Sequence, residues 1–389
     1  METLGLVRYR HSRKTSPLLL CLIALSCSSR PGVEDTVSWQ VSPLRATEEV
    51  DDLAPYVSEL EVFPVGSDGI ARPGISKILF SDPIVFLSGG VAFSASPDWK
   101  TVKQIGNIGR GPAEYLSVKD IMINAAGDEL WCMDVLNSIL RYDLSTMSFM
   151  GKVECEKKGY ARAMIPLENN GVALYTPNPP GAFPEKHETF YCLSYYTASG
   201  KTVDQWLPWT QFNVMAGFSN PVSTAAPNTS ILIPESSNIA YVFENNGLDH
   251  QIIFDFGNKW IPLNFINPKD GDHARKVGDL FDLDCYKLIS SVFFPAGDLY
   301  FHAFGKESSS WNFFISKDGT NGIRWRSVGG MAPPISAIAS RDEYLYFMYD
   351  DYGYAEEEQD PLKRLVIEKY GLPAEIGSTY LIKVRFDVG

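Results

Sequence analysis

The residue types best suited to chemistry gather in GNIGRGPAEYLSVKDI, residues 106–121, where Arg110, Glu114 and Tyr115 stand among glycines. A glycine-rich loop that holds an arginine could bind an anion through backbone N–H groups and the guanidinium. The phosphate-binding form G-x-x-x-x-G-K-[ST] does not fit, because it needs a helix after the loop and a strand is predicted here. The other interpretation is a rigid backbone corner in which Arg110 binds nearby carbonyl oxygens or pairs with Glu114. Glycines that permit positive φ, and Pro112, which fixes φ, favour this corner.

Metal and catalytic motifs are not evident elsewhere. The histidines His187, His250, His273 and His302 show neither i, i+4 pairing nor an H-E-x-x-H motif, so they predict ordinary core or surface residues. The acid-rich stretch at residues 350–360 lacks the D-x-D-x-D-G spacing of a calcium loop and predicts a solvated acidic loop. No G-x-S-x-G occurs. The sequence therefore predicts no cofactor and no metal ligands, and it leaves open whether the protein is an enzyme.

The elements that must position these residues are short apolar runs separated by turn signals. Four such runs, VKDIMI, ELWCMD, SILRYDL and FMGKVEC, follow the opening stretch within about forty residues, which fits one four-stranded antiparallel blade. The pattern recurs at residues 75–105, 161–206, 222–257, 286–328 and 335–388. The last unit has three strands, and residues 58–65 can supply the fourth, which closes the ring and removes sheet edges. We therefore predict an all-β six-bladed propeller whose last blade is closed by an N-terminal strand.

Two segments break the strand pattern. Residues 272–283 are compatible with a short helix, and residues 360–371 predict a better one. In the second, Asp360 fits the N-cap, Pro361 the first helical position and Gly371 the position just past the end.

A family resemblance supports this fold. GNIGRGPAEYLSVKDI, followed by DELWCMDVLNSILRYDLSTMSFMGKV, resembles the NHL-like repeat of bacterial six-bladed propellers, in which G-x-x-G-x-G-P-x-E-[YF] lies between blades. HQIIFDFGNKWIP, residues 250–262, looks like a later signature of the same family. The third and sixth blades depart from the pattern through insertions at 177–188 and 350–378. The resemblance to Bacteroidetes-type propeller lipoproteins of the NHL-like/TolB-like class implies fold and location, and it carries no activity.

A candidate binding site follows from propeller topology. Blade-to-blade connections and the hairpins between second and third strands lie at the same end of the ring. The polar and aromatic residues expected on this rim are Arg110, Glu114, Tyr115, Asp134, Asn137, Arg162, Trp206, Trp209 and His273. Aromatic faces beside arginine and aspartate would suit a sugar or a peptide.

The N-terminus resembles a lipoprotein leader. A basic region precedes PLLLCLIAL, residues 17–25, which is too short to span a bilayer, since a helix needs roughly 20 residues. ALSC, residues 24–27, resembles a lipobox and makes Cys27 the predicted lipid attachment; a plain signal peptide is the alternative. The expected organisation is a signal peptide over 1–27, a flexible tether over 28–57 and the propeller over 58–389.

Charge and cysteine usage limit the function. A net charge of -13 argues against nucleic-acid binding, which needs a basic surface. Cys132, Cys155, Cys192 and Cys285 are widely spaced and predict buried free thiols. We expect a monomer, attached to the cell envelope of a bacterium by lipid only, that binds an unknown protein, peptide or carbohydrate. The competing hypothesis is a metal-dependent hydrolase or lyase that uses His, Asp, Asn and Glu at the mouth of the central channel.

Overall fold

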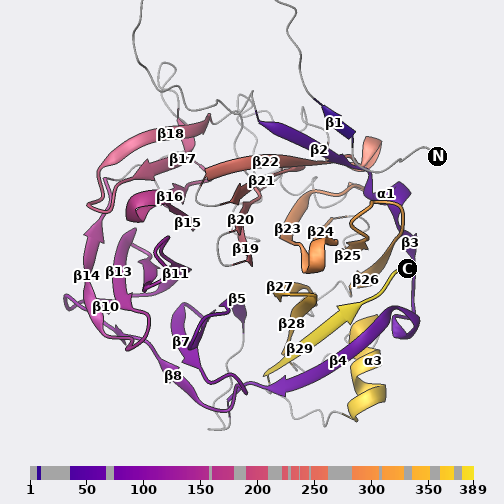
Figure 1. Ribbon diagram of the computed structural model, residues 1–389, viewed down its shortest axis with the longest axis horizontal. Coiled ribbons are helices and arrows are strands. Elements are labelled where there is room, and N and C mark those ends of the chain that lie inside the picture. The colour runs from indigo at the N-terminus through magenta and orange to yellow at the C-terminus, as the bar shows by residue number, and fades with distance from the viewer. Residues whose placement is uncertain are drawn as a thin grey trace, which may run out of the picture.

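The computed structural model describes fourteen segments of the chain. They are residues 7–9, 36–66, 74–156, 160–178, 190–208, 221–226, 229–235, 237–244, 247–261, 283–305, 309–327, 335–350, 360–371 and 379–389. Their sheets stand around a common axis like the blades of a wheel (Figure 1). The all-β six-bladed propeller predicted from the sequence is confirmed.

Each blade is built on an antiparallel sheet of four strands, which run from the axis outward in sequence order in blades 1 to 5; strands of the N-terminal segment add to the outer edges of the sheets of blades 4 and 5. Blade 1 has β5 (Ile75–Leu79), β6 (Ile84–Ser88), β7 (Val91–Ala95) and β8 (Val102–Gln104). Blade 2 has β11 (Val118–Ile123), β12 (Glu129–Asp134), β13 (Ser138–Asp143) and β14 (Phe149–Glu154). Blade 3 has β15 (Ala163–Leu167), β16 (Gly171–Tyr175), β17 (Tyr191–Tyr196) and β18 (Thr202–Pro208). Blade 4 has β19 (Val222–Ala226), β20 (Thr229–Leu232), β21 (Ile239–Glu244) and β22 (Gly247–Phe254). Blade 5 has β23 (Leu288–Phe293), β24 (Leu299–Phe304), β25 (Ser310–Ile315) and β26 (Gly322–Ser327).

Blade 6 joins the two ends of the propeller. It contains β27 (Ala337–Arg341), β28 (Tyr344–Asp350), β29 (Thr379–Phe386) and, as its outer strand, β4 (Val57–Pro64). β4 pairs antiparallel with β29 over its whole length, with Tyr380 opposite Pro64 and Phe386 opposite Val57. The predicted closure by an N-terminal strand is confirmed, and the ring needs no further element to cover that sheet edge.

The core lies between the blades. Six buried apolar clusters each join the facing sides of two adjacent blades, and the sixth joins blade 6 to blade 1. Middle strands have neighbours on both faces, so every residue of β12 and of β25 is buried. Outer strands such as β14 are largely exposed. This difference explains why middle strands such as ELWCMD and SWNFFI are nearly continuous apolar runs, whereas outer strands alternate.

The tether prediction is wrong for residues 37–57. β2 (Val37–Val41) pairs in parallel with β22, β3 (Glu48–Glu49) pairs in parallel with β26, and the short helix α1 (Pro43–Ala46) lies between them. A 3-10 turn, η2 (Ala54–Tyr56), leads into β4, and Leu53 before it is fully buried in the cluster between blades 5 and 6. We call residues 37–56 the N-terminal strap, because they bind the outer edges of blades 4 and 5 in turn. β1 (Val7–Tyr9), inside the predicted signal peptide, pairs antiparallel with β2.

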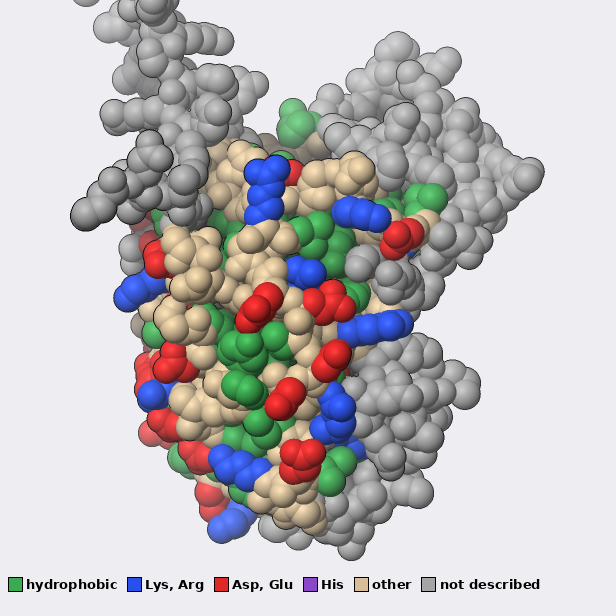
Figure 2. Space-filling model, turned by 90° about the vertical axis from the view of Figure 1, so that its right-hand side faces the viewer, with side chains coloured by type: hydrophobic (Ala, Val, Ile, Leu, Met, Phe, Trp, Pro, Cys, Tyr) green, Lys and Arg blue, Asp and Glu red, His purple; other side chains and the backbone are tan. Residues whose placement is uncertain are grey.

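Ion pairs join the N-terminal segment to the blades it covers. Arg324 of β26 approaches Glu49 of the strap at 3.4 Å, and in blade 6 Lys383 and Arg385 of β29 each approach a glutamate of β4 at 2.7 Å. On this side of the molecule acidic and basic side chains are interspersed around apolar ones (Figure 2). Exposed pairs of this kind contribute about 0–1 kcal/mol each, so the buried Leu53 and the strand pairings hold the segment more firmly.

The helix predicted at residues 360–371 is confirmed as α3 (Pro361–Tyr370). The carboxylate of Asp360 accepts hydrogen bonds from the N–H groups of Leu362 and Lys363, and Gly371 ends the helix with φ of 57°. The helix expected at 272–283 and most of the acidic stretch, 351–359, lie outside the described residues. Of the helices that are described, none is long and apolar enough to cross a membrane.

The prediction that the four cysteines are free thiols is confirmed. Cys132, Cys155, Cys192 and Cys285 are free; all are buried except Cys192, which is half-buried. Burial raises the pKa of the Cys192 thiol to about 12, so this thiol is protonated at neutral pH.

Candidate functional site at the mouth of the central channel

A buried charged pair connects the inner strands of three blades. Lys77 of β5 donates a hydrogen bond to Oδ1 of Asp120 in β11, with Nζ and Oδ1 2.8 Å apart. The other carboxylate oxygen of Asp120 accepts from the backbone N–H of Met164 in β15, at 2.6 Å. Both charged side chains are buried, at 3% and 0% exposure. Burial raises the pKa of the Asp120 carboxyl, and the Lys77 ammonium opposes that rise.

The inner strands end at a cavity of about 950 Å³. Every blade contributes to its lining, with Leu79, Met122, Met164, Thr224, Phe294 and Ser340 coming from blades 1 to 6 in order. Most of these positions precede or belong to hairpins between the first and second strands of a blade, so the cavity is the mouth of the central channel at that end. Its size is in the range of small-molecule sites.

The outer edge of the cavity carries most of its charge. Three carboxylates, Asp82, Asp342 and Glu343, and one guanidinium, Arg341, line it in addition to Lys77. Arg341 lies over the ring of Phe80, 5.6 Å from the centroid, and its Nε is 3.8 Å from Asp342. Because Asp120 neutralises Lys77, the free charge at the edge is mainly negative. The site therefore combines an apolar floor with an acidic edge.

Hydrogen bonds between neighbouring hairpins stiffen this mouth. The side-chain amide of Asn124 in blade 2 donates to Asp128 at 2.8 Å and to Asn170 of blade 3 at 3.2 Å. The backbone N–H of Ala296 in blade 5 donates to the carbonyl oxygen of Asp342 in blade 6, at 3.0 Å. Such contacts fix the relative positions of adjacent blades, so the cavity is largely formed before any ligand arrives.

A second cavity of about 720 Å³ lies between the strap and blades 4 and 5. Trp39 and Arg45 of the strap face Leu299 and Lys317 of blade 5 across it. Phe294 lines both cavities, so the two are neighbours.

The rim predicted from the sequence lies at the opposite end of the ring. None of the predicted residues that the structure describes lines the channel cavity. Asp134 is buried, and its carboxylate accepts hydrogen bonds from the N–H groups of Val135 and Ser117 at 2.6 and 3.3 Å. Asn137, with φ of 60°, accepts a hydrogen bond from the N–H of Ala161 in the next connection, at 3.2 Å. These two side chains hold loops together.

The opening stretch is a rigid corner, but Arg110 does not clamp it. β9 (Asn107–Ile108) and β10 (Glu114–Tyr115) pair in parallel within the connection between blades 1 and 2. Glu114 accepts a hydrogen bond from the N–H of Gly111 at 2.7 Å, and the hydroxyl of the buried Tyr115 donates to the carbonyl oxygen of Ile105 at 2.9 Å. A Cβ at Gly109 would lie 2.0 Å from the Glu114 carboxylate, so a side chain there would push that carboxylate out of its present position.

Arg110 itself is exposed, and it has no hydrogen-bond or ion-pair partner among the described residues. The expectation that Arg110 pairs with Glu114 is therefore wrong. The physical reason is that the backbone N–H of Gly111 in the tight loop binds the Glu114 carboxylate instead.

The remaining predicted residues separate into two groups. Arg162 lies near a buried acid that the sequence did not reveal: Glu235 of blade 4 accepts a 2.7 Å hydrogen bond from the hydroxyl of Tyr175. Burial raises the pKa of Glu235, and Arg162 opposes that rise. Trp206 packs against Tyr195, with ring centroids 5.4 Å apart. Trp209 and His273 lie outside the described residues.

Sequence reasoning also missed the pair Lys77–Asp120, whereas His302 is a core residue within its expectation. His302 in β24 is buried, with Nδ1 2.5 Å from the hydroxyl of Ser290, and burial lowers the pKa of His302 to about 4. The one signal for the charged pair was a lysine and an aspartate inside apolar inner strands, ISKIL and VKDIMI. Such residues are buried only when they are paired.

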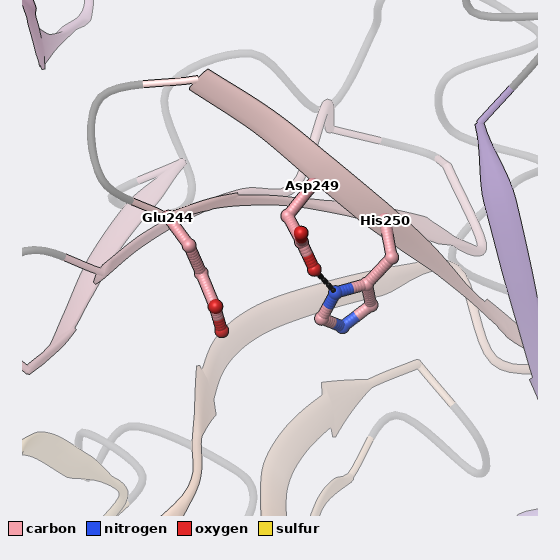
Figure 3. Close-up of side chains that lie close together, drawn as sticks. All are labelled: Glu244, Asp249 and His250. Atoms are coloured by element: carbon pink, nitrogen blue, oxygen red, sulfur yellow. Dashed lines mark hydrogen bonds and ion pairs between the residues drawn. The ribbon is translucent and has the colours of Figure 1, made fainter.

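One group of potential metal ligands exists among the described residues. Glu244, Asp249 and His250 have ligand atoms within 4.8 Å of one another (Figure 3). Nδ1 of His250 is 2.7 Å from the Asp249 carboxylate, and the imidazole stacks on Trp39 with centroids 4.1 Å apart. A hydrogen bond between Asp249 and an imidazole stacked on Trp39 accounts for this arrangement. The group lies at the hairpin between β21 and β22, and none of its members lines the channel cavity.

Among the comparisons with known proteins, a solved structure from Bacteroides fragilis agrees with the fold. A comparison with curated proteins gives no match. A candidate exported protein from Bacteroides fragilis NCTC 9343 superposes with a TM-score of 0.68 at 15% identity, covering 90% of this chain and 99% of that one. A catalytically inactive virginiamycin B lyase from Staphylococcus aureus superposes with a TM-score of 0.39 at 11% identity, covering 74% of this chain and 82% of that one. The Pan2 WD40 domain of Neurospora crassa superposes with a TM-score of 0.38 at 8% identity, covering 79% of this chain and 74% of that one.

A family profile described as 6-bladed beta-propeller (DUF5128) matches residues 95–323, from the third strand of blade 1 to the outer strand of blade 5. This match spans more than half of the sequence, and the chain therefore belongs to the DUF5128 family of six-bladed β-propellers.

Proposed function

We propose that this protein is a lipid-anchored binding protein of the bacterial cell envelope, of the NHL-like/TolB-like kind, which holds a ligand at the mouth of its central channel. The observation that carries the proposal is the cavity of about 950 Å³ to which all six blades contribute. Its apolar floor and acidic edge favour a peptide or small molecule with an apolar body and a cationic group. A carbohydrate fits less well, because the described lining has two phenylalanines but no tryptophan or tyrosine for stacking.

The alternative of a metal-dependent hydrolase or lyase receives less support. The described lining of the cavity contains no histidine or cysteine. Its three carboxylates are too far apart to form a cluster of three ligands, since the one such group among the described residues lies elsewhere. Binding therefore explains the described geometry of the mouth more fully than metal-assisted catalysis does.

A matched pair of fluorescent probes tests the binding proposal. A naphthyl-alkylamine and a naphthyl-alkylcarboxylate share an apolar body and differ in charge. We expect saturable binding of the amine at least tenfold tighter than that of the carboxylate. Asp82→Lys, at the exposed edge of the cavity, should weaken amine binding at least fivefold, and Asp51→Lys, an exposed site on the strap, should leave it unchanged. Amine binding that fails to saturate, or that Asp82→Lys does not weaken, would overturn the proposal.

Export and lipidation have their own test. The leader and lipobox in residues 1–27 support attachment at Cys27, and the likeness to a candidate exported protein agrees with an extracytoplasmic location. Cys27→Ser should move the protein from the membrane fraction to the soluble fraction of the envelope. Unchanged sedimentation after a salt wash would contradict the anchor.

A further inference from the structure

The charged side chains of the channel cavity lie on one side of it. Apart from Lys77, they come from two hairpins: Asp82 follows β5, and Arg341, Asp342 and Glu343 lie at the end of β27 and in the turn after it. The described lining that blades 2 to 5 contribute is uncharged. A ligand in this cavity therefore has its charged groups at blades 6 and 1 and its apolar body over the other blades.

Packing between blades 6 and 1 holds these two hairpins side by side. The ring of Phe80, just before the first hairpin, lies 4.5 Å from the ring of Tyr346 in β28. The guanidinium of Arg341 in turn lies over Phe80, 5.6 Å from the ring centroid. Such a contact restricts the position of the guanidinium and leaves its N–H groups available to an acceptor. The cavity edge thus presents a cation and carboxylates at defined positions.

Arg341 has hydrogen-bonding capacity that the described residues leave unused. Its Nε lies 3.8 Å from the Asp342 carboxylate, which is an ion-pair distance but too long for a hydrogen bond. No other group in the described part of the chain accepts a hydrogen bond from this guanidinium. With 56% of the side chain exposed, water can satisfy its donors while the cavity is open. A ligand that covered Arg341 without offering an acceptor would leave these donors unsatisfied, which costs free energy.

The charges at this edge oppose a simple anion and leave a simple cation incompletely matched. Three carboxylates share the lining with one guanidinium, and Arg385, outside the lining, lies 3.7 Å from Glu343. The local charge stays negative even when Arg385 is counted, so a ligand that carries only a carboxylate or a phosphate is repelled. A ligand that carries only an ammonium pairs with the carboxylates but offers no acceptor to Arg341.

We propose that the cavity binds a free α-amino acid with a large apolar side chain, an inference that rests on the binding function proposed above. The ammonium of this ligand pairs with the carboxylates of the edge. Its carboxylate accepts two parallel N–H···O bonds from Arg341, the geometry that a guanidinium favours. Both ligand charges are attached to one carbon, which suits Arg341 and Asp342 as groups of opposite sign 3.8 Å apart. The apolar side chain covers the floor, which includes Leu79 and Phe294.

Three naphthyl probes test this headgroup. Naphthylalanine carries both charges, naphthylalaninamide keeps only the ammonium, and N-acetyl-naphthylalanine keeps only the carboxylate. On the wild-type protein, naphthyl fluorescence should show naphthylalanine binding at least tenfold tighter than either of the other two. Arg341→Gln should weaken naphthylalanine at least tenfold and leave the amide within threefold of its wild-type affinity, because Arg341 contacts only the carboxylate. The matched control Arg326→Gln, exposed on β26 and outside the cavity lining, should bind all three probes like wild type.

The outcomes separate this inference from the binding function on which it rests. If the amide saturates, is weakened by Asp82→Lys and binds as tightly as naphthylalanine, the binding function stands and the amino-acid inference is overturned. An Arg341→Gln variant that weakens naphthylalanine and its amide equally overturns the inference too, as does an acetylated probe that binds as tightly as naphthylalanine. If no probe saturates, both proposals fail. An unchanged urea midpoint for Arg341→Gln shows that any lost affinity does not come from unfolding.

Discussion

Removing the ammonium of Lys77 should destabilise the propeller more than any exposed charge substitution. In Lys77→Met, the Asp120 carboxylate keeps its hydrogen bonds from the N–H groups of Ile121 and Met164 but loses its only counter-charge within hydrogen-bond distance among the described residues. Leaving one partner of a buried ion pair uncompensated costs about 3–5 kcal/mol. Because Asp120 bridges three blades, the loss should affect unfolding of the whole ring.

The pH dependence of this loss has a definite sign. Burial already raises the pKa of Asp120, and removal of Lys77 raises it further. An acid whose folded pKa exceeds its unfolded value of about 3.9 contributes stability that is full below that value and is lost as pH rises through the folded pKa. The deficit of Lys77→Met relative to wild type should therefore be largest at pH 7 and smaller at pH 5.

Two companion variants separate charge from packing. Lys77→Met/Asp120→Asn removes both charges and keeps an acceptor for Met164, so it should recover most of the loss. Asp120→Asn alone should cost less than Lys77→Met, since Lys77 lines the cavity and its ammonium can turn toward solvent there. Urea midpoints followed by tryptophan fluorescence, with unchanged slopes, measure all three. The shift in urea midpoint is converted to a free energy of unfolding with a slope of about 1–3 kcal/mol per molar urea. A free energy of unfolding for Lys77→Met within about 1 kcal/mol of the wild-type value would refute the reasoning.

Two further predictions concern His302 and the strap. Burial lowers the pKa of His302 to about 4. The contribution of this residue to the free energy of unfolding is therefore full above about pH 6.5, and about 3 kcal/mol of it is lost as pH falls toward 4. His302→Asn should therefore lose less stability than wild type between pH 7 and pH 4.5 in urea unfolding, and an equal loss would contradict this assignment. Leu53→Ala should lower the free energy of unfolding by about 2–5 kcal/mol and increase amide hydrogen exchange in β2 and β3; unchanged exchange there would show that Leu53 does not hold the strap.

Local patterns sufficed for much of the fold. Turn residues and short apolar runs located the strands of every blade, because hairpins are read from neighbouring residues. Asp360, Pro361 and Gly371 bounded α3 for the same reason. The strap was missed because β2 and β3 are short outer strands whose partners, β22 and β26, lie more than two hundred residues away. Their composition therefore resembles that of a linker.

The candidate site depended on longer-range structure. Glycines 109 and 111 showed that the opening stretch turns tightly, but whether Arg110 or Glu114 holds the turn depends on which side chain reaches the loop N–H groups. Asp134 and Asn137 were placed at the correct hairpin, and only the folded ring shows that both are occupied by backbone groups.

The sequence by itself determined the number of blades and the free cysteines, because the repeating strands and the cysteine spacings can be read from residue types and local patterns. It determined the closing strand by count, because the last unit has three strands and needs a fourth, although the two paired strands lie at opposite ends of the chain. Tertiary structure alone decided where a ligand could sit. The cavity takes one short contribution from each of six inner strands, and the pair Lys77–Asp120 that stiffens it joins residues 43 positions apart. No local pattern encodes a convergence of side chains that exists only when the ring has closed.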